Sequence, residues 1–198
     1  AAEIADLRAE NSRLTQAAAS ASGAEAESAR QAADLVAKLR QKIADKNAAA
    51  TGQHRNHGQA TPKDAFLSYA WAIDAGEVDA LMQLITFEEQ GREAIRALHS
   101  GMPEAVRKQY PTPEEFMAFL YVADALLNPV PGPDVAAGFI TTEVRPGVVA
   151  VHRPGTKRGG MKFVETTEGW KCVVPDAYPA HVARRVLSNE MLGKLGIN

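Results

Sequence analysis

The stretch TPKDAFLSYAWAIDAGEVDALMQLITF, residues 61–87, decides how the rest of the chain is arranged. Thr61 stands before Pro62, and Asp64 follows in the first turn, a combination typical of a helix N-terminus. Gly76 follows at a point where a helix C-terminus favours positive φ. We therefore predict a helix that carries an apolar stripe of Phe66, Tyr69, Ala70 and Ile73. A second helix should begin near Val78, with Leu81, Leu84 and Ile85 on one face.

This pattern resembles the start of the nuclear transport factor 2-like superfamily, in which a first helix ends in an A-G-(D/E)-V-D-A-L turn and leads into a second. The segment GGMKFVETTEGWKCVVP, residues 159–175, is similar to the last two strands of that family. The resemblance covers residues 61–175. It implies a curved sheet wrapped around a long helix, forming a cone with a mouth at one end.

Length and composition limit the classes of protein to which the chain can belong. Its 198 residues suit one domain with an appendage. The net charge of −2 and the absence of a long basic run argue against nucleic acid as the main partner. The single cysteine, Cys172, excludes an intramolecular disulfide and any multi-cysteine metal site. No apolar run is long enough to span a membrane.

Residues 1–46 read as an Ala-rich helix with part of a heptad pattern. Positions a, d, a and d are taken by Ile4, Leu7, Asn11 and Leu14, and an Asn at an a position favours a two-stranded coiled coil. The same frame then passes through alanines and Glu25 before it recovers at Leu35 and Leu39. Two interpretations stay open, a parallel oligomerisation helix and a soluble, partly frayed helix. Glu25 and the weak middle heptads favour the second.

Residues 47–60 have no periodicity and two glycines, which predicts a flexible linker. His54 and His57 lie in this linker, but no third or fourth ligand is near them in the sequence. We therefore expect no metal site and no cofactor. The domain proper should occupy residues 61–198.

Helices precede strands in that domain, so the expected fold class is α+β, with helices packed in a curved, cone-like antiparallel sheet. Thr112 and Glu115 form a predicted capping box before FMAFLYVADALL, which should be the most buried helix. Short turns then separate β-rich runs, which favours an antiparallel meander. These runs are residues 137–144, 148–153, 161–167 and 170–174. Residues 176–192 read as an extra C-terminal helix, which could plug the mouth of the cone.

Polar residues inside otherwise apolar elements are the candidates for a site. The ligand-binding candidates are Tyr69, Trp71, Tyr121, Asp124, His152 and Trp170, with Asp74 and Glu165 as further polar positions. The family includes isomerases, dehydratases and cyclases that use an Asp, His or Tyr in the cone. By that resemblance the catalytic candidates are Asp124, His152 and Tyr121, with the first two as bases and Tyr69 or Tyr121 as hydrogen-bond donor.

Structural interpretations of the same residues compete with the functional ones. A buried Asp124 requires a partner, and an Arg or Lys is the more common one. Tyr69 and Trp170 suit packing positions, His152 suits a strand histidine with its hydrogen bonds satisfied, and Cys172 suits a buried, unreactive thiol. None of these residues lies in a motif that fixes a catalytic role.

These features favour a non-catalytic, tethered domain for protein interaction or for binding a small apolar ligand. Its helix over residues 1–46 would act in self-association or as a spacer. The alternative is a small-molecule isomerase, dehydratase or cyclase that uses the cone. A third possibility is a structural protein with a filled cone. The sequence begins at Ala1 without an initiator Met, so a removed signal or anchor would place the protein in the cell envelope, and otherwise we expect the cytoplasm.

Overall fold

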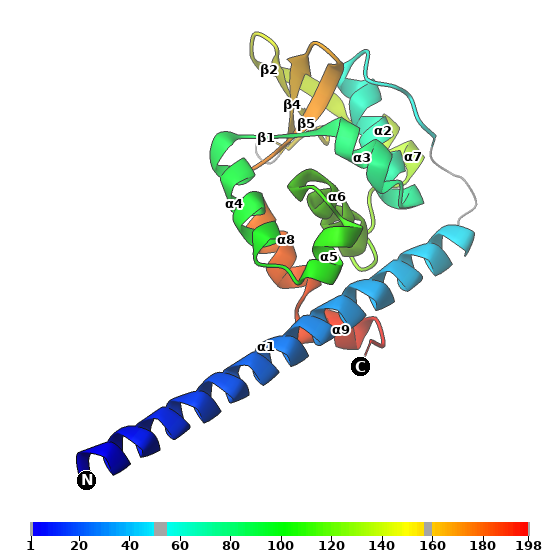
Figure 1. Ribbon diagram of the computed structural model, residues 1–198. Helices are drawn as coiled ribbons and strands as arrows, with labels where there is room; N and C mark the ends of the chain where they lie inside the picture. The colour runs from blue at the N-terminus through cyan, green and yellow to red at the C-terminus, as the bar shows by residue number, and fades with distance from the viewer. Residues whose placement is uncertain (1, 50–54, 157–159, 198) are drawn as a thin grey trace.

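The computed structural model describes residues 2–49, 55–156 and 160–197, and within these residues the chain is α+β (Figure 1). The helices are α1 (Ala2–Ala49), α2 (Pro62–Ala75), α3 (Val78–Leu84), α4 (Glu89–Ser100), α5 (Glu104–Gln109), α6 (Pro113–Asp124), α7 (Pro133–Ala137), α8 (Tyr178–Val186) and α9 (Asn189–Lys194). The strands are β1 (Ile85–Phe87), β2 (Ile140–Arg145), β3 (Val148–His152), β4 (Met161–Thr166) and β5 (Gly169–Val174). Among the described residues no helix is both long and apolar enough to cross a membrane.

The predicted helix ends are confirmed where local signals are strong. The Thr61 side chain accepts a hydrogen bond from the Asp64 amide, and α2 ends at Gly76, whose φ of 70° suits glycine. Before α6, the Thr112 side chain and the Glu115 side chain each bond the other's backbone amide, so the capping box is complete. Both ends of α2 and the start of α6 are therefore set by hydrogen bonds between residues no more than four positions apart.

The five strands form one mixed sheet in the order β1-β5-β4-β3-β2. Strands β2 to β5 are an antiparallel meander, as predicted. The prediction of a wholly antiparallel sheet is wrong at β1, which pairs parallel to β5, with Ile85 opposite Cys172 and Phe87 opposite Val174. Ile85 therefore leaves the helix in which the sequence placed it. Three residues are too few to show a strand pattern.

Two other predicted boundaries also need correction. The strand expected over residues 137–144 begins only at Ile140, because Pro133 starts the short helix α7. The single C-terminal helix expected over residues 176–192 is broken after Val186 into α8 and α9. The break turns the chain end back towards α1, where Leu192 and Ile197 line the same groove as Leu35.

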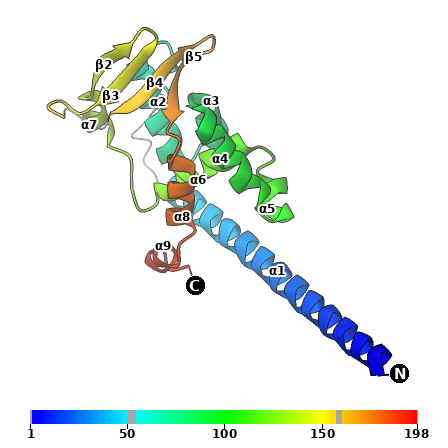
Figure 2. The same cartoon turned by 90° about the vertical axis from the view of Figure 1, so that its left-hand side faces the viewer.

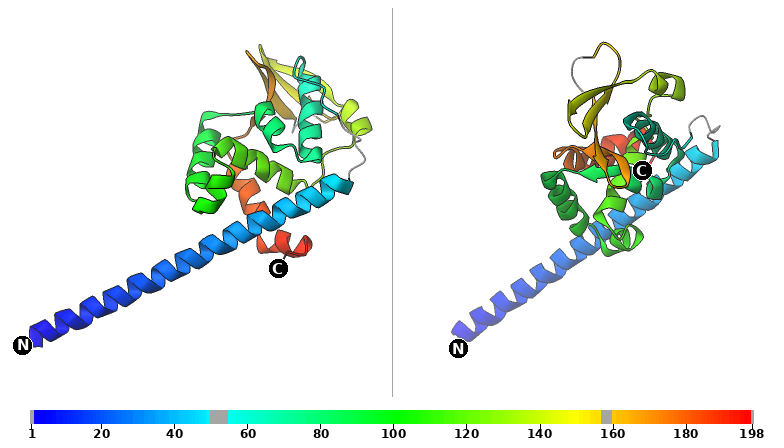
Figure 3. Two further views of the ribbon diagram at one scale, coloured as in Figure 1. Left: turned by 45° about the vertical axis from the view of Figure 1, so that its right-hand side comes forward. Right: turned by 90° about the horizontal axis from the view of Figure 1, so that it is seen from above.

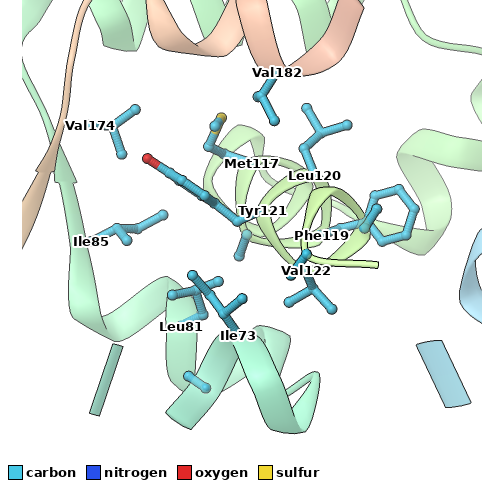
Figure 4. Packing of buried hydrophobic residues seen from close by; sticks show 14 of the residues in the cluster. Ile73, Leu81, Ile85, Met117, Phe119, Leu120, Tyr121, Val122, Val174 and Val182 are labelled. Carbon is cyan, nitrogen blue, oxygen red and sulfur yellow. The ribbon is translucent and has the colours of Figure 1, made fainter. Parts of the chain in front are cut away.

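Helix α6 forms the centre of the core, and every residue from Phe116 to Asp124 is buried. In Figure 4 its side chains meet Leu81 and Ile73 on one side and Val174 and Val182 on the other. These contacts place α6 among α2, α3, α8 and the end of β5. The expectation that this helix is the most buried one is confirmed for the described residues.

Helix α1 has two halves with different surroundings. Near its C-terminal end, Val36, Leu39 and Ile43 are buried against the domain, and Lys46 Nζ lies 3.1 Å from Asp74 Oδ1. The other half projects beyond the domain in every view (Figures 1, 2 and 3). Residues 23–28, where side chains of this half are described, are exposed.

The described part of the predicted linker, residues 55–60, is hydrogen-bonded to the domain. The His57 amide donates to Ser68 Oγ over 2.8 Å, and Ser68 Oγ donates to the Gly58 carbonyl over 2.9 Å. The Trp170 amide donates to the Gln59 carbonyl over 2.9 Å. His54 lies outside the described residues.

Candidate functional site: a buried tyrosine cluster and a projecting helix

Three tyrosines from three helices meet at the centre of the domain. The Tyr69 ring from α2 packs edge-on against Tyr121 from α6, with ring centroids 5.8 Å apart. Tyr121 in turn stacks on Tyr178 from α8, with centroids 5.1 Å apart. We call Tyr69, Tyr121 and Tyr178 the tyrosine cluster.

Burial decides the protonation of this cluster. It raises the pKa of Tyr69 and of Tyr121 well above that of a free phenol, because the charged phenolate would lose its hydration. Burial also raises the pKa of Tyr178, and it raises the pKa of the neighbouring Cys172 thiol to about 12. At neutral pH the cluster therefore offers neutral hydroxyls that can donate or accept hydrogen bonds.

Beside the cluster, Asp124 forms a bidentate ion pair with Arg185 of α8. Arg185 Nε lies 2.5 Å from Asp124 Oδ1, and a terminal guanidinium nitrogen lies 2.5 Å from Oδ2. Asn128 Nδ2 also donates to Oδ1 over 3.2 Å. The hydrogen bond to Asp124 raises the pKa of Arg185, and the neighbouring Tyr178 raises it further. The buried carboxylate thus has the basic partner that its position requires.

The other predicted site residues lie elsewhere. His152 on β3 contacts Thr142 Oγ1 at 2.9 Å and the Arg153 carbonyl at 3.0 Å, so its recorded partners belong to β2 and to the turn after β3. Trp170 on β5 is held at its amide by Gln59. Trp71 on α2 is half-buried, and Glu165 on β4 is exposed.

The structure thus unites three of the predicted candidates, Tyr69, Tyr121 and Asp124, and adds two residues that the sequence reading did not select. Tyr178 and Arg185 both come from α8, the helix that was interpreted only as a plug. The sequence signal that could have identified Tyr178 and Arg185 was their place on a helix with an apolar face. That helix was a possible partner for the lone carboxylate of α6.

The chemistry of this cluster favours structural hydrogen bonding. A general base needs a free lone pair directed at substrate, and both Asp124 oxygens are engaged by Arg185. The tyrosines contact one another and connect α2, α6 and α8. We interpret the cluster as a polar link that fixes α8 across the core.

A second candidate surface lies where α1 leaves the domain. A groove of about 600 Å³ separates Glu25, Ser28 and Ala32 of α1 from Met102 and Arg107 at the α4–α5 connection. A neighbouring groove of about 440 Å³ is lined by Ser28, Ala32 and Leu35 together with Leu187 and Leu192. Both grooves are open to solvent, so this stretch of α1 is accessible to a partner.

Among the described residues, no group of three or more His, Cys, Asp or Glu side chains is arranged to hold a metal ion. Comparison of the chain with protein-family models, curated proteins and solved structures gave no match.

Proposed function

We propose that this protein is a non-catalytic, helix-tethered interaction domain, in which α1 joins copies of the chain and holds their α+β domains apart. The proposal includes the nuclear transport factor 2-like type of fold, with the sheet curved as part of a cone and α8 closing its mouth. The position of Tyr178, stacked on Tyr121, supports that role for α8.

The projecting half of α1 is the observation that carries the proposal. A single helix in water is marginally stable, because helix formation is costly to nucleate and most helical stability in proteins comes from packing. In this structure α1 extends from Ala49 to Ala2, far beyond Val36, which is the most N-terminal buried residue among those whose side chains the structure describes. The projecting half is also where the sequence places Ile4, Leu7, Asn11 and Leu14 at heptad spacing. A partner along this heptad face would supply packing for the projecting half.

The domain supports this choice over catalysis. The polar groups at its centre are engaged with one another, and the interior beside them is filled by Phe66, Phe116, Phe119 and Phe163. Of the open grooves, two border α1, and two others lie between α4 and α8 and beside β1. Two of these grooves thus lie where the projecting helix leaves the domain.

Two double variants with equal added charge test the proposal. Leu7→Lys with Leu14→Lys places two lysines at d positions of the heptad frame. Ala9→Lys with Gln16→Lys places two lysines at f positions, away from the frame's seam. We expect light scattering to give a multiple of the chain mass for the unaltered protein and the f-position variant, and a single chain mass for the d-position variant.

Equal masses for both variants and the unaltered chain would overturn the proposal. Circular dichroism of both variants checks that the domain remains folded.

A further inference from the structure

The heptad face of α1 overlaps its domain-docking face from Leu35 onward, which limits how a second copy can pair. In the heptad frame that begins with Ile4 at a and Leu7 at d, Leu35 is a d position and Leu39 is an a position. Both pack against the domain, and Leu39 is fully buried. A partner helix therefore cannot follow the seam beyond about residue 32 unless the domain is displaced. The free seam runs from residue 4 to about residue 28.

A parallel, in-register pair conflicts with this arrangement. Each helix would continue past residue 32 into the space filled by the other copy's domain, because α1 is continuous through this point (Figure 2). Such a pair would also place Glu25 opposite its own copy on the seam, where like charges repel. Asn11 at an a position is the feature that favours the parallel arrangement, and it does not remove either conflict.

An antiparallel pair avoids both conflicts. When position 4 lies opposite position 28 of the other copy, every a position in the free seam meets a d position. Leu14 then faces Ala18, Ile4 faces Ser28 and Asn11 faces Ala21, so a larger side chain opposes a smaller one in three of the four pairings, and in the fourth Leu7 faces Glu25. The two domains lie at opposite ends of the pair, with their Leu35 residues about 57 Å apart along the axis at 1.5 Å per residue.

Open space at the exit of α1 supports the same arrangement. The first turn of the incoming helix carries Glu3 and Asp6. It would lie beside the groove of about 600 Å³ that Arg107 lines. Arg107 is held in place by a 3.0 Å hydrogen bond from its Nε to the Met102 carbonyl. Glu25 and Glu104 line the same groove, so it offers the incoming turn open space and one guanidinium, without a net positive charge.

We propose that a second copy of this chain binds α1 in antiparallel orientation, with its N-terminal turn seated in the groove between α1 and the α4–α5 connection. This inference rests on the proposed function, since it specifies the partner and geometry of the same surface. It goes further in predicting a two-ended dimer in place of two domains side by side.

Mixed disulfide trapping tests the orientation in the full chain. Chains with Ile4→Cys are mixed with chains with Ser28→Cys under mild oxidation, and each variant is also oxidised alone. The native Cys172 is suitable background, because it is buried and burial raises its pKa to about 12. A matched control mixes Ala9→Cys with Gly23→Cys. These two positions lie at the same level of the antiparallel pair as each other, but both are f positions that point away from the seam. Gly23 has no neighbour within 4 Å of an added Cβ.

The antiparallel pair predicts a covalent dimer from the 4 and 28 mixture and none from either variant alone or from the control. In that arrangement the two copies of position 4 are about 36 Å apart at 1.5 Å per residue, far beyond the reach of a disulfide. A covalent dimer from Ile4→Cys alone or Ser28→Cys alone would establish a parallel pair and overturn the inference. Association by light scattering without cross-linking of the mixture would also overturn it while leaving the proposed function intact. A single chain mass throughout would overturn both.

Discussion

Removing the Arg185 side chain tests whether the polar cluster fixes α8 to the core. The Asp124 side chain is 8% exposed and the Arg185 side chain is 36% exposed, so the two partners differ in their access to water. In Arg185→Ala the carboxylate keeps only Asn128 as a side-chain partner and cannot turn to solvent. Loss of one partner of a fully buried ion pair costs about 3 to 5 kcal/mol. Since Arg185 is partly exposed and screened, we expect a loss of about 2 to 3 kcal/mol.

Urea unfolding, followed by circular dichroism, measures this change as a shift of the midpoint, by roughly 1 M for an ordinary m-value. Arg184→Ala is the matched control, because Arg184 is the exposed neighbour on the same helix. It should change the free energy of unfolding by no more than about 0.5 kcal/mol. Equal effects of the two substitutions would refute the argument that the Asp124–Arg185 pair holds α8 in place.

Three further predictions concern other parts of the fold. Leu39→Ala should cost about 2 to 4 kcal/mol in urea unfolding, because Leu39 is fully buried between α1 and the domain; a loss as small as that of exposed Ala37→Ser would contradict the docking of α1. Thr112→Ala should cost about 1 kcal/mol through loss of the capping box before α6, and an unchanged midpoint would contradict that role. The raised tyrosine pKa values predict stability that is complete below pH 10 and is lost as pH rises through the folded-state values, about 12 for Tyr110. Phenolate absorbance of the folded chain should therefore rise at higher pH than that of the chain unfolded in denaturant, and coincident curves would contradict the burial of the cluster.

Local signals in the sequence predicted the helix ends well. Thr61, Gly76 and Thr112 act through hydrogen bonds and backbone angles within a few residues, so one sequence is enough to recognise them. Strand β1 could not be recognised in this way. It is three residues long, and its partner in β5 follows 87 positions later, with Ile85 opposite Cys172. Only tertiary pairing makes it a strand.

The candidate site shows the same division. Asp124 in an apolar helix indicated that a partner was needed, but Arg185 lies 61 positions away and nothing local identifies it. Tyr69 and Tyr121 were selected for their positions inside apolar helices, and the structure adds Tyr178 between them and Arg185. The use of one face of α1 for both heptads and docking was also beyond the sequence, because docking depends on the folded surfaces of α5 and α6.

The most direct test of the account is the mass of the unaltered chain in solution, measured by sedimentation equilibrium over a range of concentrations. Self-association through α1 predicts a mass that rises to twice the 21.2 kDa of one chain. A mass that stays at 21.2 kDa at every concentration would contradict the account, because the projecting half of α1 would then have no second copy to pack against.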